Sequence, residues 1–377
     1  MSNWKRPFLY RLGPGIVLPL SLSLSLFLSG CGGGGDGPAS DNMPSAVPGA
    51  PICTAPAEVT ADTVLDGACV YRQAFTITRS GVTLDCNGAL IDGRGTDAKG
   101  IYVNSRGNPL SNVTIRNCRL KDQASAGIAV GWSGSLAARL QTYSRDDIYA
   151  RTPQQVLIEN VSVAGAGDTG IYIETYASGI TLSHVTVTGS RGPGVYLDAS
   201  TRDNRIVDST FTGNGVPRTR EAIAIDSSAG NVIAGNQFSG NALAAIALYK
   251  NCGENQGPTR WQHSDRNLIQ DNDFAAQSVG VWIASRQSRD LSNWNCGDPS
   301  YYAGRYFLDY AQDNRVISNR FSNVRQGVIV EDDNNTVSGN TFSGSRSADI
   351  VTGAQYRAMY LGRPVSGLVA ENNTYLP

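Results

Sequence analysis

Short runs of alternating apolar and polar residues recur along most of the chain, each beginning with a small residue. They occur at Gly100–Val103, Gly127–Val130, Gly170–Ile173, Gly194–Leu197, Ala222–Ile225, Ala245–Leu248, Gly280–Ile283 and Gly327–Val330. Alternation over four or five residues, bounded by Gly, Asn, Asp and Ser, predicts short strands joined by turns. No segment after the first 31 residues shows the 3.6-residue periodicity of an amphipathic helix, so we expect an all-β protein.

A second phrase follows the first and resembles N-x-[IV]-x-x-N-x-F. It occurs at Asn204–Phe211, Asn231–Phe238, Asn267–Phe274, Asn314–Phe321 and Asn335–Phe342. Strand pairs that repeat every 20–30 residues or so predict a solenoid, because one coil cannot bury its apolar face alone.

Asparagines recur at one place in these coils, and we expect them to form an inward ladder at one corner. Their amides would satisfy each other's donors and acceptors. The expected ladder residues are Asn117, Asn160, Asn236, Asn272, Asn319 and Asn340. His184 stands at the equivalent place of its own coil and is expected to be structural.

These motifs, together with the opening segment Gly81–Gly93, resemble the right-handed parallel β-helix family, which includes the pectate lyases. The resemblance implies a single solenoid of about ten coils over residues 52–377. The family also includes polygalacturonases, alginate lyases and epimerases and phage tailspikes, so the resemblance specifies the fold far better than the activity. The segment Ala245–Lys250 resembles the lysine-bearing strand of alginate and dermatan lyases, but the metal-binding Glu residues expected before that lysine are missing.

Three insertions interrupt the repeat, at residues 131–155, 252–266 and 287–312. Long loops in a solenoid are frequent binding sites. These insertions are rich in Trp and Tyr, whose rings suit the C–H faces of sugars, although such loops can also simply brace the rod.

Carboxylates fall on one outward face of three successive coils. Because alternate residues of a strand point outward, Glu174, Asp198 and Asp226 are expected side by side. Carboxylates this close repel each other. Ca²⁺ bound by all three would relieve the repulsion, and so would a raised pKa on one of them, which could then serve as a general acid. The third alternative is an ordinary solvated acidic face.

The residues around this column suggest chemistry on a uronate polymer. A lyase or C5-epimerase would move the C5 proton with Lys250, Tyr249 or Arg286, with Asp226 as a further catalytic residue. Tyr172, Tyr196, Trp282 and Trp294 are the expected substrate-binding residues. His263, in an insertion beside Trp261, is a weaker candidate for the base.

Other functions fit the same residues. A glycoside hydrolase would use two of the carboxylates directly. A non-catalytic glycan-binding or structural protein would use only the aromatic side chains. An accessory role in metalloenzyme assembly is disfavoured, because the whole chain holds only three Met and two His.

The N-terminal segment is typical of an export signal. Residues 1–30 carry Lys5, Arg6 and Arg11 before a short apolar run, and Leu28–Cys31 resembles the bacterial lipobox, in which the Cys is lipidated. Residues 31–51 have the composition of a flexible tether. We expect a lipid-anchored protein, monomeric and held at the outer membrane, because Gly32 is not the Asp that retains many lipoproteins at the inner membrane.

Charge and cysteine content refine this interpretation. Of 31 Lys and Arg residues, three lie in the leader, which leaves 28 against 32 acidic residues and disfavours nucleic acid as a partner. Six cysteines besides Cys31 allow fifteen pairings. Proximity suggests Cys53–Cys69 and Cys86–Cys118. Cys252 and Cys296 lie in two of the insertions and are candidates for a disulfide that ties those insertions together.

Overall fold

The computed structural model describes residues 49–251, 253, 257–287, 289–292, 294, 296–344 and 348–377. The predicted leader, Cys31, most of the tether and Cys252 therefore lie outside the described residues. None of the helices in the described ranges has the length and apolar character needed to span a bilayer.

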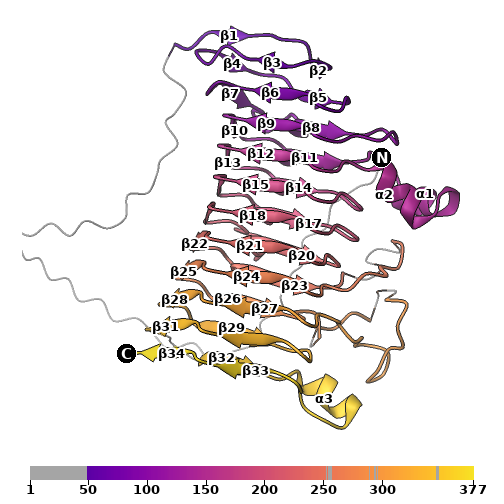
Figure 1. The fold of residues 1–377 in the computed structure, drawn as a ribbon, viewed down its shortest axis with the longest axis vertical. Coiled ribbons are helices and arrows are strands. Elements are labelled where there is room, and N and C mark those ends of the chain that lie inside the picture. Colours follow the sequence, from indigo (N-terminus) through magenta and orange to yellow (C-terminus); the bar gives the residue numbers. More distant parts are fainter. Residues whose placement is uncertain are drawn as a thin grey trace, which may run out of the picture. The chain divides into compact units, whose positions relative to one another are not determined.

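The chain winds into a solenoid in which every third strand pairs in parallel, so each coil gives one strand to each of three sheets (Figure 1). The first sheet contains β1 (Ile52–Cys53), β4 (Val70–Tyr71), β7 (Leu90–Asp92), β10 (Arg119–Lys121), β13 (Ser162–Ala164), β16 (Thr186–Thr188), β19 (Thr210–Thr212), β22 (Gln237–Ser239), β25 (Asp273–Ala275), β28 (Arg320–Ser322), β31 (Thr341–Ser343) and β34 (Thr374–Leu376).

The second sheet carries the predicted acidic column. It contains β2 (Glu58–Val59), β5 (Phe75–Ile77), β8 (Lys99–Asn104), β11 (Ala126–Gly131), β14 (Ile171–Ile173), β17 (Val195–Leu197), β20 (Ile223–Asp226), β23 (Ile246–Tyr249), β26 (Val279–Ile283), β29 (Gln326–Val330) and β32 (Ala348–Thr352).

The third sheet follows the second along each coil. It contains β3 (Thr63–Val64), β6 (Thr83–Asp85), β9 (Thr114–Arg116), β12 (Leu157–Glu159), β15 (Thr181–Ser183), β18 (Arg205–Val207), β21 (Val232–Ala234), β24 (Leu268–Gln270), β27 (Arg315–Ile317), β30 (Thr336–Ser338) and β33 (Val369–Glu371). The described part thus has sheets of 12, 11 and 11 strands, slightly more coils than the ten expected.

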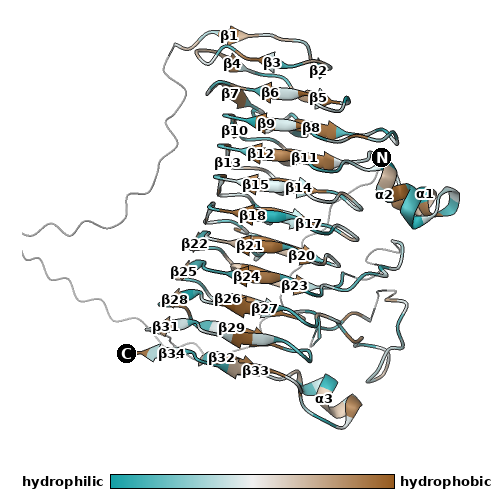
Figure 2. Ribbon diagram, in the orientation of Figure 1, coloured by the Kyte–Doolittle hydropathy of each residue, from teal (hydrophilic) through white to brown (hydrophobic). Residues whose placement is uncertain are grey.

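Inward side chains of the three sheets form one continuous core, and the strands are the most apolar parts of the ribbon (Figure 2). The phenylalanines that end the second repeated phrase stack directly on one another. Phe211, Phe238, Phe274, Phe321 and Phe342 have successive ring centroids 4.7–5.2 Å apart. In-register pairing makes this stack inevitable, because equivalent residues of successive coils are direct neighbours.

Buried amides form the expected ladder at the corner between the third and first sheets. Each backbone N–H and side-chain Nδ2 donates to the Oδ1 of the next residue, from Asn236 to Asn272, Asn319, Asn340 and Asn373. A second ladder occupies another corner and runs through Asn204, Asn231, Asn267, Asn314 and Asn335. The ladders satisfy buried polar groups that would otherwise cost about 1–3 kcal/mol each.

Three residues assigned to the first ladder lie one position away from it. Asn117, Asn160 and His184 have φ values of 54°, 50° and 53° and occupy the left-handed corner residue that precedes the ladder position. The buried ladder positions of these coils are Cys118, Val161 and Val185 instead. The prediction was wrong because Asn suits both positions, the left-handed backbone as well as the ladder.

Three short helices are present that periodicity did not predict. The first insertion contains α1 (Leu136–Thr142) and α2 (Arg145–Arg151), and α3 (Gln355–Leu361) lies near the C-terminus. Ser135 and Ser144 cap the first two. Each helix has only seven residues, too few for a clear periodic signal. All three lie between a strand of the second sheet and one of the third, and they project from the same edge as the loops of the other insertions (Figure 1).

Two of the disulfides predicted from proximity are present, Cys53–Cys69 and Cys86–Cys118. They tie together the first coils of the solenoid. Cys296 is also disulfide-bonded, and its predicted pairing with Cys252 falls outside the described residues.

Substitutions of inward ladder residues and of corner residues should differ in their effect on the free energy of unfolding. Asn272 accepts two hydrogen bonds from Asn236 and donates to Ile233 O and Asn319 Oδ1, each at 2.9 Å. We expect Asn272→Ala to lower the free energy of unfolding by roughly 3 kcal/mol, because it leaves buried polar groups without partners. Urea denaturation measures this cost. The control His184→Asn changes the exposed corner residue and should cost little; equal losses in the two variants would show that the amide ladder carries no special stability.

Candidate functional site

The outward face of the second sheet has the register that the sequence predicts. Tyr172 pairs with Tyr196, Asp226 with Tyr249, and Ala247 with Trp282. Backbone bonds place Glu174, Asp198 and Asp226 at equivalent points of three successive coils. The predicted column of carboxylates is therefore present in space.

Each carboxylate of this column accepts a hydrogen bond from an aromatic residue of an earlier coil. Tyr172 donates to Asp198 Oδ2 at 2.6 Å and Tyr196 donates to Asp226 Oδ2. These two tyrosines were predicted to bind substrate, but their hydroxyls are used inside the protein. Burial and the adjacent carboxylates raise the pKa of both tyrosines well above the ordinary value.

Glu174 reaches across a whole coil. It pairs with Lys99 Nζ at 2.7 Å and accepts from Tyr102 at 2.8 Å. The intervening coil has Gly131 at this point, and a Cβ there would lie 2.3 Å from Glu174 Oε2. Glycine is thus required at this position because the Glu174 side chain occupies the space of a Cβ.

Arg260, from the second insertion, closes the column. Its Nη1 lies 2.6 Å from Asp198 Oδ1 and 2.7 Å from Asp226 Oδ2, so one guanidinium neutralises two carboxylates. Burial raises the pKa of Asp226, against the opposing effect of Arg260. Sequence reasoning missed Arg260, since an insertion has no register from which its contacts follow.

The three acids do not fit the Ca²⁺ site expected of them. Asp198 and Asp226 converge on Arg260, whereas Glu174 turns away to Lys99. No group of three or more potential ligands was found among the described residues. Lys99 and Arg260 offset the mutual repulsion of these acids.

The predicted catalytic residues are buried and internally paired. Tyr249 donates to Glu221 Oε1 at 2.5 Å, and Arg286 lies 3.8 Å from the centre of the Tyr249 ring. Lys250 forms an ion pair with Asp298. Tyr249, Lys250 and Asp226 are 0%, 3% and 0% exposed, so none of them meets a polymer at the surface in this arrangement.

Glu221 and Asp309 are two further buried acids that the sequence pattern did not single out. Burial alone would raise the pKa of Glu221, but its ion pair with Arg220 brings that pKa to about 2. Burial raises the pKa of Asp309 to about 7. Asp309 accepts from the backbone N–H groups of Lys250 and Arg286 at 2.7 and 2.8 Å, and so holds two coils together.

The two predicted tryptophans serve different contacts. Trp282 is half-buried and donates to Glu331 Oε2 at 3.2 Å. Trp294 packs in a small cluster with Leu291, Cys296 and Phe307 within the third insertion. The structure does not bring Trp294 together with the tyrosines of the column in any described contact.

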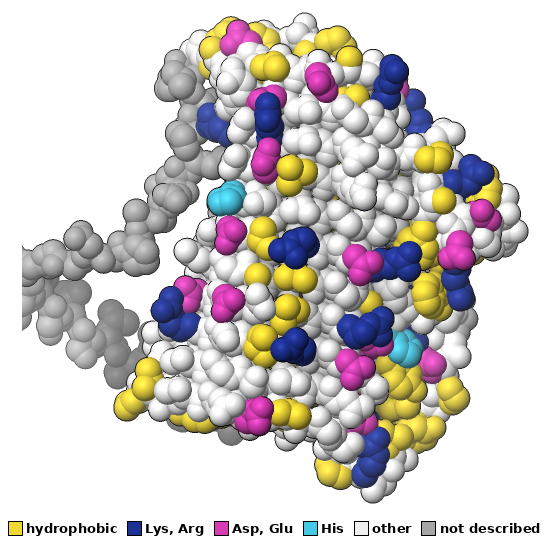
Figure 3. Space-filling model, in the orientation of Figure 1, with side chains coloured by type: hydrophobic (Ala, Val, Ile, Leu, Met, Phe, Trp, Pro, Cys, Tyr) yellow, Lys and Arg dark blue, Asp and Glu magenta, His cyan; other side chains and the backbone are white. Residues whose placement is uncertain are grey.

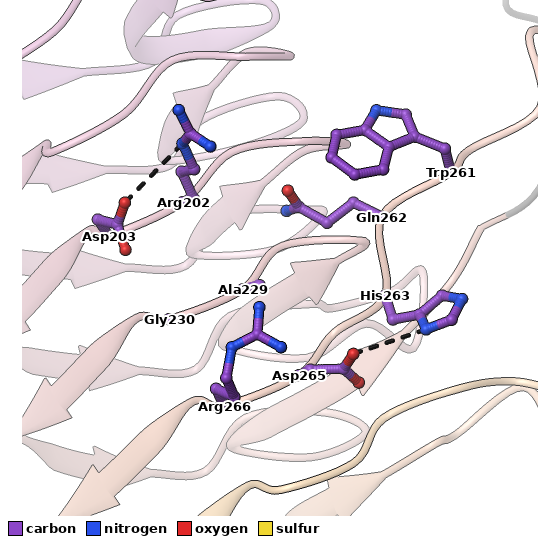
Figure 4. Close-up of a pocket in the computed structure, with 9 residues that line it drawn as sticks. All are labelled: Arg202, Asp203, Ala229, Gly230, Trp261, Gln262, His263, Asp265 and Arg266. Carbon is purple, nitrogen blue, oxygen red and sulfur yellow. Dashed lines mark ion pairs between the residues drawn. The ribbon is translucent and has the colours of Figure 1, made fainter.

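An open groove lies beside the column, where the second insertion crosses the edge of the solenoid (Figure 4). Its volume is about 390 Å³, and it is lined by Arg202, Asp203, Ala229, Gly230, Trp261, Gln262, His263, Asp265 and Arg266. Trp261 is 41% exposed. Arg260 directly precedes Trp261, so its ion pairs anchor the loop that brings Trp261 to this groove.

Gln262 fixes the floor of the groove. Its Nε2 donates to Thr201 O and Ser227 O at 2.8 and 2.9 Å, and its Oε1 accepts from Tyr149. His263, the weaker candidate for a base, lies 3.5 Å from Asp265 Oδ2 and stacks on Tyr310. The sequence had placed His263 beside Trp261 but could not show that both face one groove.

Cations stack on aromatic rings along the same edge. The pairs are Arg139 over Trp132, Arg151 over Tyr143, Arg145 over Trp261 and Arg202 over Tyr149, with distances of 5.0, 4.7, 4.6 and 3.9 Å to the ring centroids. Such pairs hold flat rings and guanidinium groups in fixed positions at the surface.

A family model described as the right-handed β-helix region matches residues 99–257. This match, with three parallel sheets wound coil upon coil, decides the fold. The protein is a right-handed parallel β-helix. Comparison of its sequence with curated proteins finds no match.

Solved structures share the β-helix at low sequence identity. A periplasmic alginate epimerase has 10% sequence identity and a TM-score of 0.55, and the match covers 84% of this chain and 76% of the other. The catalytic domain of an α-1,3-glucanase in complex with nigerose has 13% identity and a TM-score of 0.51, covering 83% and 62%. The A-module of a mannuronan C-5 epimerase from Azotobacter vinelandii has 14% identity and a TM-score of 0.48, covering 85% of each chain. Identities this low establish the shared fold alone.

Removing the Arg260 guanidinium should destabilise the β-helix. Arg260→Met leaves Asp198 and Asp226 buried together without a cation, and breaking a buried pair in this way costs about 3–5 kcal/mol. Urea denaturation measures the loss, and adding Asp226→Asn to this variant should restore part of it. The control Arg320→Met removes an exposed pair with Asp273 and should cost less than about 1 kcal/mol. A loss in Arg260→Met as small as the control's would show that the ion pairs of Arg260 with Asp198 and Asp226 do not stabilise the fold.

Asp309 should make stability depend on pH. Its pKa of about 7 in the folded protein exceeds the ordinary value of 3.8, so the folded state keeps a proton that the unfolded chain has released. This contribution to stability is complete below the ordinary pKa and is lost as pH rises through about 7. We expect Asp309→Asn to be less stable, since an amide has one acceptor oxygen for two N–H groups, and to show a flatter dependence over this range. Unfolding curves at several pH values test this; an unchanged slope would mean that Asp309 is ionised throughout.

Proposed function

We propose that the protein binds a polysaccharide in the groove beside Trp261, with a uronate polymer as the favoured ligand. The observation that carries the proposal is an exposed Trp261 between arginines in a groove of about 390 Å³. Sugar rings pack on aromatic faces, and guanidinium groups match carboxylates in fixed two-pronged geometry.

The charges at the groove favour an acidic ligand. Among the described residues of the groove, Arg266 forms no ion pair, and the one ion pair of Arg202 is a 3.8 Å contact with Asp203. Arg145 does not line the groove but stacks over the ring of Trp261. Asp265, the other acid of the groove, accepts from Gln312 N at 2.8 Å and faces His263. Of the matched structures, one is an alginate epimerase and another holds the sugar nigerose. Carbohydrates are therefore the ligand class that fits the chemistry of the groove.

A uronate lyase or C5-epimerase is the second candidate. Burial raises the pKa of Asp226, and it raises the pKa of Asp309 to about 7. The second candidate is supported by Asp309, since a carboxyl group that stays protonated near neutral pH can serve as a general acid. Both groups lie beside Lys250, the residue predicted to move the C5 proton. Against it, these side chains are buried and paired. A hydrolase at the same carboxylates has the same difficulty.

We also infer that the protein is exported, anchored through a lipid on Cys31 at the outer membrane, and monomeric. The two disulfides in the first coils support an oxidising compartment. The lipid itself is tested by mass spectrometry of the membrane fraction from cells that express the native chain and Cys31→Ala. The native chain should carry the acyl mass and sediment with membranes, and the variant should do neither.

Changing Trp261 separates binding from catalysis. We expect Trp261→Ala to weaken binding of alginate or pectate at least tenfold, which corresponds to about 1.4 kcal/mol, because it removes the stacking surface. Affinity electrophoresis or calorimetry measures the loss, and a chelator should leave binding unchanged.

Lys250→Met is the matched variant for the second candidate. Binding with wild-type affinity in Lys250→Met, without ultraviolet absorbance from an unsaturated product in any sample, supports a binding protein. Product formation that disappears in Lys250→Met would replace the binding proposal with the lyase. Equal affinities in wild type and Trp261→Ala would refute the groove.

A further inference from the structure

Five tyrosines meet where the third insertion contacts the C-terminal helix. Tyr306 and Tyr356 stack with centroids 4.2 Å apart, Tyr301 and Tyr360 at 4.5 Å, and Tyr302 lies 5.0 Å from Tyr356. Tyr356 and Tyr360 are four residues apart in α3 and therefore share one face of that helix. Segments far apart in sequence thus build one aromatic platform, which we call the tyrosine cluster.

Two members of the tyrosine cluster are open to solvent. Tyr302 is 54% and Tyr360 49% exposed, and the neighbouring Met359 is 60% exposed, whereas Tyr301 and Tyr306 are buried beneath them. Hydrophobic side chains, tyrosines included, gather at this lower right edge of the molecule (Figure 3). Contiguous exposed aromatic surface of this kind is uncommon unless it meets a ligand or partner.

The third insertion supplies aromatic rings to both the groove and the cluster. His263, which lines the groove, stacks on Tyr310 with centroids 4.6 Å and planes 23° apart. Tyr310 follows Tyr306 by four residues in this insertion, and Tyr306 stacks on Tyr356 in the cluster. One short segment therefore leads from the groove to the tyrosine cluster.

We propose that the tyrosine cluster is a second sugar-binding subsite, and that one polysaccharide chain runs from the groove past His263 and Tyr310 to the cluster. The proposal rests on the function proposed above and adds that the ligand is a long chain rather than a short sugar. The subsite recognises the ring faces and hydroxyls of sugars, because its exposed members are Tyr rather than aliphatic residues.

The charges around the cluster agree with this assignment. Arg305 pairs with Asp290, and Arg357 is buried against Asp332 and Asp333. The cluster therefore presents no uncompensated arginine among these residues, in contrast to the groove with Arg202 and Arg266. Carboxylate recognition belongs to the groove and stacking to the cluster.

Chain length is the variable that tests the second subsite. The experiment measures affinity by calorimetry for uronate oligosaccharides from the disaccharide to the polymer, using wild type, Trp261→Ala, Tyr302→Ala/Tyr360→Ala and Tyr302→Phe/Tyr360→Phe. Circular dichroism checks that each variant is folded. Both tyrosines are about half exposed, and neither belongs to the core formed by the three sheets.

We expect wild-type affinity to rise with chain length until a ligand spans both subsites. The alanine double variant should bind short oligosaccharides as wild type does and long ones at least about tenfold more weakly, while the phenylalanine double variant keeps most of the gain. A gain with length that is unchanged in the alanine double variant overturns the second subsite. Failure of the wild type to bind any oligosaccharide or polymer overturns the proposed function and this inference together.

The test also distinguishes other occupants of the cluster. Binding to anionic lipid vesicles that is lost in the alanine double variant, with polymer binding intact, would assign the cluster to a membrane surface and overturn the sugar subsite. Polymer binding that is retained in Trp261→Ala but lost in the alanine double variant would make the cluster the primary site and would overturn the proposed path of the chain from the groove.

Discussion

Parallel, in-register stacking of coils is the constraint on which the rest of this structure depends. Every residue of a coil has its equivalent directly above and below, so a polar group can be buried only where the next coil offers a matching partner. Asn236, Asn272 and Asn319 meet this condition because an amide both donates and accepts. The same rule aligns the phenylalanine stack, and it lines up Glu174, Asp198 and Asp226 on the outer face.

That alignment brings like charges together, and cations from an insertion and from another coil offset their repulsion. Adjacent carboxylates on neighbouring coils destabilise each other unless a cation lies between them. Arg260 supplies the cation for Asp198 and Asp226, and Lys99 supplies it for Glu174. Since Arg260 adjoins Trp261, the ion pairs that stabilise the column also position the loop that forms the groove. The acids thus hold in place the loop that carries Trp261.

Placing every insertion at one turn of the coil has a functional consequence. The solenoid repeats along its axis, so α1, α2, the loops of the second and third insertions and α3 follow one another along a single edge. Their aromatic residues then form a row instead of isolated patches. A row of rings suits a polymer, since both the ligand and the site repeat along one direction.

The sequence by itself determined the coil repeat, the strand register and the outward column, because alternation and equivalent spacing are local properties that in-register stacking carries directly into space. It also predicted two disulfides from proximity. Only the tertiary structure decided the partners of the acids, the burial of Lys250 and Tyr249, the shared groove of Trp261 and His263, and the assembly of the tyrosine cluster. Those contacts join insertions to coils far away in sequence, and an insertion has no repeat from which its position follows. The tertiary structure also decided that Asn117 and His184 lie at the corner whereas Asn236 lies in the ladder. The two positions are adjacent in sequence, so a shift of one residue exchanges an exposed left-handed position for a buried one.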